Sequence, residues 1–180
     1  MRVVAGKYRG RPLKGPKHEG VRPTADRIKE ALFNILGARI HGAAFLDLFA
    51  GTGGIGIEAL SRGAANVVFT DQNIASIRLI RQNLTILDSN EQIRLLHLSF
   101  NRAIDLLAEE NARFDLVFLD PPFEGGILNQ AIQRLLNQNL VRDDGIIIAE
   151  HPRKLLLNVP ELQGETRNYG DICLTFLNKR

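Results

Sequence analysis

Apolar residues follow two alternating patterns along the chain: short continuous runs, and segments with helical spacing. The short runs have the length of buried strands, and they cover residues 45–49, 67–70, 93–98, 114–119 and 146–149. Helical spacing predicts helices over about 55–63, through 77–87, around 103–107 and over about 127–137. Strands that are apolar on both faces and separated by helices need a sheet covered on both sides. The pattern therefore predicts a doubly wound α/β fold with a mostly parallel sheet.

The two ends of the chain depart from this alternation. Before the first strand, apolar residues within 28–36 recur at helical spacing, with Thr24 placed to cap a helix that should end near Gly37. At the other end, residues 166–169 and 172–177 flank a Gly-Asp turn. This spacing predicts an antiparallel hairpin that closes the sheet.

Positive charge is concentrated at the N-terminus. The chain has 23 basic and 20 acidic residues, a net charge of +3. Six basic residues and no acidic one lie in residues 1–18, so the remainder carries 17 basic and 20 acidic residues. The six are Arg2, Lys7, Arg9, Arg11, Lys14 and Lys17. We interpret residues 1–20 as a basic arm or hairpin that contacts nucleic-acid phosphates, with a solvated tail as the alternative, and residues 21–180 as one cofactor-binding domain.

Composition argues against several other classes of protein. No run of about 18 apolar residues occurs, and the N-terminus lacks the apolar stretch of a secretory signal, so we expect a cytoplasmic protein. Cys173 is the only cysteine, which excludes an internal disulfide. The four histidines are too scattered to gather metal ligands, and we expect no metal site.

The residues after the first predicted strand form a candidate cofactor loop. Gly51 to Gly56 fit G-x-G-x-x-G, and Asp71 lies 20 residues after Gly51, where a carboxylate can take both ribose hydroxyls. Taken alone, these features would suggest a dinucleotide such as NAD. Asp47, however, precedes the loop, where its negative charge opposes a pyrophosphate and favours an α-ammonium and a sulfonium. We therefore expect S-adenosylmethionine as the cofactor.

Further candidate cofactor contacts lie beside the ends of the predicted strands, where this type of sheet binds ligands. Around the glycine loop and the ribose acid they are Phe49, Thr52, Gly53 and Gln72. After the third strand, Ser99 or Asn101 could bond the adenine edge, although either could instead cap the following helix.

The fourth predicted strand runs directly into a candidate catalytic turn, Asp120-Pro121-Pro122-Phe123. Two consecutive prolines fix the backbone and remove two donors, which leaves nearby carbonyls free to accept hydrogen bonds from an amino group. Asp120 adds a charged acceptor, and Phe123 is placed to stack on a base. The alternative is a rigid proline turn with a core phenylalanine. The acid and the aromatic at the ligand edge favour the catalytic interpretation.

Three segments of the chain form a characteristic set: VRPTADRIKEALFN at 21–34, DLFAGTG at 47–53 and DPPF at 120–123. Together they resemble the RsmD family of small-subunit ribosomal RNA guanine-N2 methyltransferases, over nearly the whole chain. The resemblance implies a Rossmann-like class I methyltransferase fold, S-adenosylmethionine as donor and a guanine as acceptor. It also implies that Arg22 and Thr24 lie beside the methionine end of the cofactor. Many relatives carry an acid after the third strand, where this chain has Ser99-Phe100-Asn101.

Two other functions compete with this interpretation. A DNA or RNA adenine-N6 methyltransferase also uses a D-P-P-aromatic turn, although DNA enzymes of this kind generally carry a target-recognition region for which this chain has no room. A nucleic-acid-binding protein without catalysis is the second, and the intact Asp47, Asp71 and Asp120 argue against it. We expect a monomer that acts on ribosomal RNA, free or within a small-subunit assembly intermediate.

Overall fold

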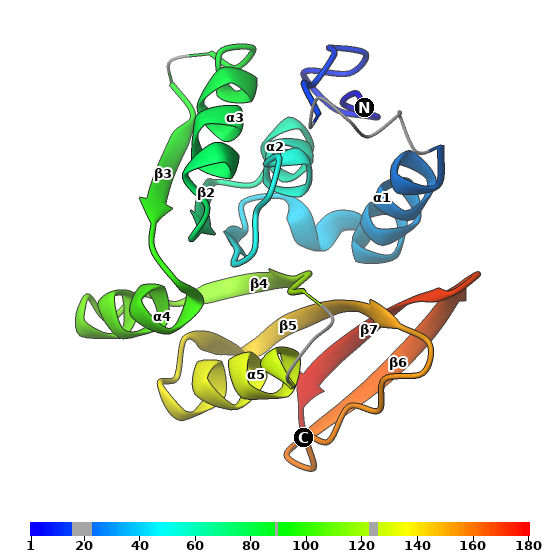
Figure 1. The fold of residues 1–180 in the computed structure, drawn as a ribbon, viewed down its shortest axis with the longest axis vertical. Coiled ribbons are helices and arrows are strands. Elements are labelled where there is room, and N and C mark those ends of the chain that lie inside the picture. The colour runs from blue at the N-terminus through cyan, green and yellow to red at the C-terminus, as the bar shows by residue number, and fades with distance from the viewer. Residues whose placement is uncertain (16–22, 89, 123–125) are drawn as a thin grey trace.

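The computed structural model describes residues 1–15, 23–88, 90–122 and 126–180, and for residues 23–25 it describes the backbone alone (Figure 1). The helices in these ranges are α1 (Pro23–Leu36), the 3-10 helix η1 (Gly37–Ile40), α2 (Gly54–Ser61), α3 (Ile74–Leu84), α4 (Phe100–Glu109) and α5 (Ile127–Asn137). The strands are β1 (Ala44–Asp47), β2 (Asn66–Asp71), β3 (Gln92–His97), β4 (Phe114–Leu119), β5 (Val141–Pro152), β6 (Leu162–Tyr169) and β7 (Ile172–Lys179). None of the described helices is long and apolar enough to cross a membrane.

The strands form one sheet in the order β3-β2-β1-β4-β5-β7-β6. The pairs among β1 to β5 are parallel, whereas β7 is antiparallel to both β5 and β6. The predicted doubly wound α/β fold with an antiparallel C-terminal hairpin is thus confirmed. The strand order reverses between β1 and β4, and ligands of such sheets bind beyond the carboxyl ends of the strands at this point.

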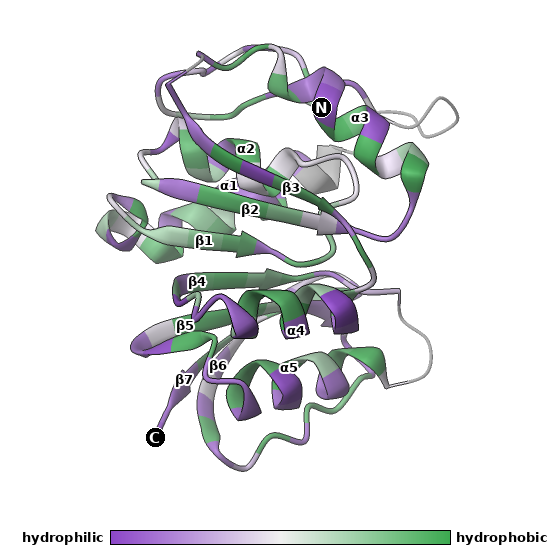
Figure 2. Cartoon of the chain, turned by 90° about the vertical axis from the view of Figure 1, so that its left-hand side faces the viewer, coloured by the Kyte–Doolittle hydropathy of each residue, from purple (hydrophilic) through white to green (hydrophobic). Residues whose placement is uncertain are grey.

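Helices cover both faces of the sheet. One cluster of buried side chains joins α1, α2 and α3 to alternate strand residues such as Phe45 and Phe118. A second cluster joins α4 and α5 to the intervening residues, such as Leu46 and Val117. Figure 2 shows α4 and α5 together on one side of the sheet, with apolar strands behind them. Because the strands are buried on both faces, they form the continuous apolar runs seen in the sequence.

The N-terminal arm is part of the core. Its residues 1–15 form a compact loop that is closed by a bridge between Arg2 and Pro12 and lies near α2 (Figure 1). Val3, Tyr8 and Leu13 are buried in the cluster shared with α1 and α2. The arm therefore adds apolar side chains to the domain rather than extending from it as a separate appendage.

A buried polar network holds the arm against α2. The carboxylate of Glu58, which has no exposed surface, accepts hydrogen bonds from the backbone N–H groups of Val4 (2.8 Å) and Ala5 (2.9 Å). The ammonium group of Lys29 on α1 lies 3.5 Å from the same carboxylate and donates to the Arg2 carbonyl. Gly6 has φ of +82°, and a Cβ there would lie 1.8 Å from the Ser61 carbonyl oxygen. Only glycine allows the arm to approach α2 this closely.

Candidate active site

The predicted cofactor and catalytic residues meet at the carboxyl edge of the sheet. A cavity of about 540 Å³ opens there, between the segments that follow β1, β2 and β4. The predicted residues that line it are Phe49, Gly51, Asp71, Gln72, Asp120, Pro121 and Pro122. Residues that lie far apart in the sequence therefore share one site, because parallel strands place their carboxyl ends along the same edge.

The glycine loop has the tight geometry that its sequence predicts. Gly51 and Gly53 have positive φ of +52° and +76°, a region that side chains with a Cβ rarely adopt. A Cβ on Gly56 would lie 2.2 Å from the ring of Phe69 on β2. The first two glycines thus make the turn, and the third lets α2 pack closely against the sheet.

Asp47 is buried beside this loop and forms a hydrogen bond with its backbone. The residue is only 1% exposed, and its Oδ2 accepts a hydrogen bond from the backbone N–H of Gly56 (3.1 Å). Burial raises the pKa of the Asp47 carboxyl to about 7, and the nearby charges of Asp120 and Asp71 contribute to the rise. Asp47 therefore holds the loop in place through its hydrogen bond with Gly56 and does not itself face the cavity.

Asp71 joins the loop to the start of α3. Its Oδ2 accepts from the Gly51 N–H (2.9 Å) and its Oδ1 accepts from the Asn73 N–H (2.7 Å). The carboxylate also lines the cavity at the end of β2, the position at which this fold binds ribose hydroxyls.

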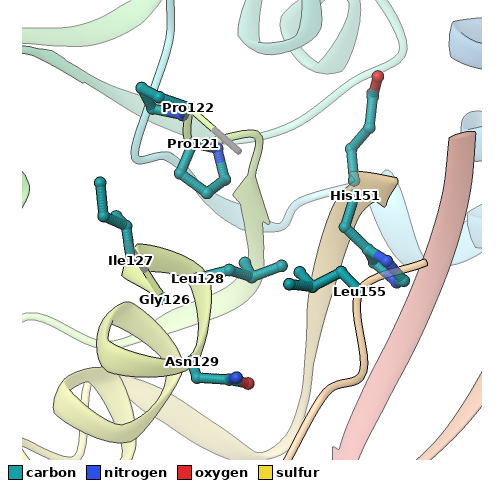
Figure 3. A pocket seen from close by; sticks show the side chains of 9 residues that line it. Pro121, Pro122, Gly126, Ile127, Leu128, Asn129, His151 and Leu155 are labelled. Atoms are coloured by element: carbon teal, nitrogen blue, oxygen red, sulfur yellow. The ribbon is translucent and has the colours of Figure 1, made fainter. Parts of the chain in front are cut away.

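The catalytic turn borders two neighbouring spaces. Asp120, Pro121 and Pro122 line the main cavity, and the two prolines also line a small recess against the first turn of α5. Figure 3 shows Pro121 and Pro122 above Ile127 and Leu128, with Leu155 on the opposite wall. Although Asp120 opens onto the cavity, the surrounding protein desolvates its carboxyl group and raises its pKa to about 6.

The sequence of the whole domain matches a known family. The model of the family described as conserved hypothetical protein 95 matches residues 1–178. The chain belongs to this family. Relatives of the chain include ribosomal RNA small subunit methyltransferase D of Haemophilus influenzae, 40% identical over 89% of this chain and 83% of the relative. The protein of the same name from Escherichia coli is 37% identical over 83% of this chain and 74% of the relative. The resemblance to the RsmD family is confirmed.

Solved structures support the same fold. A hypothetical protein of Thermus thermophilus is 31% identical, with 99% of both chains covered and a TM-score of 0.83. A more distant methyltransferase-type chain, SMU.776 complexed with SAH, is 16% identical and has a TM-score of 0.64 over 87% of this chain and 50% of that chain. The predicted class I methyltransferase fold is confirmed.

Some family motif residues lie outside the described part of the structure. Arg22, Phe123 and the side chain of Thr24 belong to this group, as does Lys17 of the arm. Thr52 and Gly53 shape the loop but do not line the cavity. Within the described ranges, no cluster of three His, Cys, Asp or Glu side chains is placed to hold a metal ion.

The two candidates for the adenine contact take different roles. The Ser99 hydroxyl caps α4 by accepting from the backbone N–H of Arg102 (3.4 Å). The Asn101 side chain does not line the cavity, and its buried Oδ1 has no hydrogen-bond partner among the described residues. Neither side chain thus lines the cavity, and Leu98 and Phe100 line it at this position instead.

Sequence reasoning missed the apolar walls of the cavity. Leu48, Leu98, Phe100 and Ile127 line it, and the ring centroids of Phe49 and Phe100 are 5.5 Å apart. Each of these residues except Ile127 lies just beyond the end of a strand, which is the signal that could have identified them. Apolar walls beside the Asp71 carboxylate suit an adenine ring, and the cluster of carboxylates suits a cationic methionine end. The described residues therefore fit S-adenosylmethionine.

Replacing Asp71 with alanine is expected to weaken S-adenosylmethionine binding by roughly 10- to 150-fold, or about 1.5–3 kcal/mol, through loss of charge-assisted ribose bonds. Titration calorimetry measures this change, and NAD should give no binding heat with either protein. Asp71→Asn is the matched variant, because it keeps an acceptor for one loop N–H and should lose less affinity. Unchanged affinity in Asp71→Ala would mean that the carboxylate serves only the loop and α3.

Proposed function

We propose that this protein transfers a methyl group from S-adenosylmethionine to the exocyclic N2 amine of a guanine in small-subunit ribosomal RNA. The observation that carries the proposal is that the Asp120-Pro121-Pro122 turn and the ribose acid Asp71 open onto one cavity. Membership of the family and the names of its relatives in Haemophilus influenzae and Escherichia coli support methyl transfer to small-subunit ribosomal RNA.

When bound, S-adenosylmethionine supplies an electrophilic methyl group on a sulfonium. The protein has to hold an aromatic amine with its lone pair facing that methyl group. In this proposal Asp120 and a carbonyl of the proline turn accept hydrogen bonds from the two N–H groups of the amine. These bonds turn the nitrogen lone pair out of the ring plane. The methyl group would pass to the amine nitrogen as its bond to the sulfonium breaks, leaving a neutral thioether, and the proton released by the nitrogen would pass to solvent.

The charge of Asp120 favours guanine over adenine. Guanine presents N1–H and N2–H side by side, so that one carboxylate can accept both. Adenine presents an acceptor, N1, beside its amino group and can engage only one oxygen of the carboxylate. Guanine-N2 methylation is therefore preferred to the adenine-N6 alternative.

Exposed basic residues of the arm provide the phosphate contacts in this proposal. Arg2, Arg9 and Lys14 are exposed at the surface of the arm. Lys7 differs, because its ammonium lies 2.9 Å from Asp88 and 3.1 Å from Glu91 in the connection between α3 and β3. Because these carboxylates already balance the charge of Lys7, we expect Arg2, Arg9 and Lys14 to be the stronger phosphate ligands.

Nucleoside mass spectrometry of RNA methylated in vitro tests the proposed function. The expected product is N2-methylguanine in small-subunit rRNA, formed on free rRNA or on small-subunit particles isolated from cells that lack the modification. Running both substrates in parallel decides whether an assembly intermediate is required. N6-methyladenine in place of N2-methylguanine, or transfer to DNA instead of rRNA, would contradict the proposal.

A further inference from the structure

A second carboxyl group lies beside Asp120 on the neighbouring strand. In the parallel pair β4 and β5, Phe118 is opposite Ile148 and Leu119 is opposite Ala149. Continuing this register by one residue places Asp120 opposite Glu150. Adjacent strands are about 4.8 Å apart, so the two acids are cross-strand neighbours.

The two acids also lie close together in space. Side chains alternate between faces along a strand, and Ile148 lies in the core cluster under α1 and α2, so Glu150 points to this same face two residues later. Asp120 lies one residue beyond the end of β4, close enough for its negative charge to act on the carboxyl group of Glu150. Glu150 lines the recess beneath Pro121 and Pro122, so it belongs to the surroundings of the catalytic turn.

The strand order shows which of the two acids lies nearer the cofactor loop. The glycine loop follows β1, Asp71 ends β2, Asp120 follows β4 and Glu150 lies on β5. Glu150 thus stands on the far side of Asp120 from the cofactor loop. A base whose amino group is held at Asp120, close to the cofactor, would extend the rest of its hydrogen-bonding edge toward Glu150.

The surroundings of Glu150 favour its protonated form at neutral pH. Burial raises its pKa to about 8, and the negative charge of Asp120 adds to the shift. Its partner on β7 is the uncharged Leu174, and the neighbouring His151 is bonded to the Thr175 hydroxyl and the Pro152 carbonyl. Asp47 beneath the loop is the third acid near the turn, and it interacts with Asp120. Among these described neighbours of Glu150, the Asp120 carboxylate is therefore the group whose charge acts on the Glu150 carboxyl group.

We propose that Glu150 determines the specificity for guanine, by donating a hydrogen bond from its protonated carboxyl group to O6 while Asp120 accepts from N1–H and N2–H. The inference rests on the proposed function. The edge of guanine runs donor, donor, acceptor from N2 to O6, and the pair Asp120 and Glu150 offers acceptor, acceptor, donor in the same order. Adenine held by its amino group would place the N1 acceptor against a carboxylate oxygen and would offer Glu150 no carbonyl.

The pH dependence of kcat/KM for the RNA substrate tests this assignment in the full-length protein. The wild type should give a bell-shaped profile, with an acid limb near pH 6 from Asp120 and an alkaline limb near pH 8 from Glu150. Glu150→Gln keeps a donor at every pH, so the alkaline limb near pH 8 should disappear and leave only the fall at higher pH that ionisation of guanine N1–H causes. At pH 9 only about a tenth of Glu150 would be protonated, so this variant should be roughly tenfold faster than the wild type.

Removing the donor gives the complementary result. Glu150→Leu should lose roughly 10- to 50-fold in kcat/KM for RNA at pH 7, because O6 is left without a partner, while the Kd for S-adenosylmethionine stays within about twofold. Asp144→Asn is the matched control, since it removes an exposed acid from the opposite end of β5 and should keep the wild-type profile. Thermal unfolding of each variant verifies that it is folded, and Glu150→Gln alone decides the question if Glu150→Leu does not fold.

An alkaline limb that stays near pH 8 in Glu150→Gln, or a Glu150→Leu variant with wild-type kcat/KM, would overturn the role of Glu150. In both cases the wild type would still form N2-methylguanine, and the proposed function would stand. A wild-type protein that forms no N2-methylguanine overturns the proposed function and this inference together.

Discussion

Replacing Asp120 with alanine is expected to lower kcat for RNA methylation by at least about 100-fold, while the Kd for S-adenosylmethionine changes by less than about threefold. The carboxylate acts on the acceptor amine, whose orientation it sets through N–H bonds that matter most as the lone pair turns toward the methyl group. The loop that would hold the cofactor instead donates its backbone hydrogen bonds to the carboxylates of Asp47 and Asp71. Loss of Asp120 therefore separates turnover from cofactor affinity.

Single-turnover methyl transfer and titration calorimetry on the same preparation measure these two quantities. Asp120→Asn is the informative companion variant, because its amide keeps one acceptor oxygen but presents an N–H₂ group where the second is needed. It should retain more activity than alanine and less than the wild type. An Asp120→Ala protein with wild-type kcat would show that the proline turn orients the base without its acid, and the catalytic interpretation of this turn would fail.

Deleting residues 1–18 is expected to unfold the domain rather than merely weaken its contact with RNA. The deletion removes the buried side chains of Val3, Tyr8 and Leu13, each worth about 1.5–3 kcal/mol. It also strips Glu58 of two backbone donors inside the protein. The three side chains together contribute roughly 4.5–9 kcal/mol, which approaches the whole stability of an ordinary domain. We expect a truncated protein that is insoluble, or that melts more than about 10 °C below the full chain.

Charge substitutions test the RNA contact without disturbing the core. Replacing Arg2, Arg9 and Lys14 with glutamine removes exposed charges only, and the slope of log K against log salt should become shallower by about 2–3. Lys7→Gln is the control, because Asp88 and Glu91 already balance that charge, and its slope should stay near the wild-type value. A triple variant with the wild-type slope would make the arm a structural element alone. A truncated protein as stable as the full chain would contradict its place in the core.

The sequence alone predicted the fold class, which is confirmed, and it singled out the candidate cofactor loop and the candidate catalytic turn. These features depend on local properties, namely the period of the apolar residues, the glycines that permit positive φ, and an acid or proline at the end of a strand. Asp71 and Asp120 could be assigned to one site for the same reason, because a parallel sheet brings the carboxyl ends of its strands to one edge whatever their separation in sequence.

The sequence underestimated the length of two strands, β5 and β6, whose extent depends on pairing with neighbouring strands. Residues 146–149 predicted a short strand, but β5 extends over Val141–Pro152, and β6 begins at Leu162 rather than at 166. The side chains of β6 are mostly exposed and polar, so they carry no apolar run. Its residues become a strand because β7 offers backbone partners along its whole length.

Only the tertiary structure decided which side chains work together. The sequence predicts a basic, phosphate-binding arm or hairpin, yet the apolar side chains of this arm are buried and its backbone is bonded to Glu58 on α2, more than fifty residues away in the chain. Ser99 and Asn101 were equal candidates for the adenine contact in the sequence. The structure shows that α4 begins at Phe100, so that Ser99 is its N-cap. Glu150 carried no local signal, and the register of β4 against β5 is what places it beside Asp120. Such pairings depend on how distant segments align across the sheet, and the free energy that fixes the alignment comes from burial shared by the whole core rather than from the residues beside either acid.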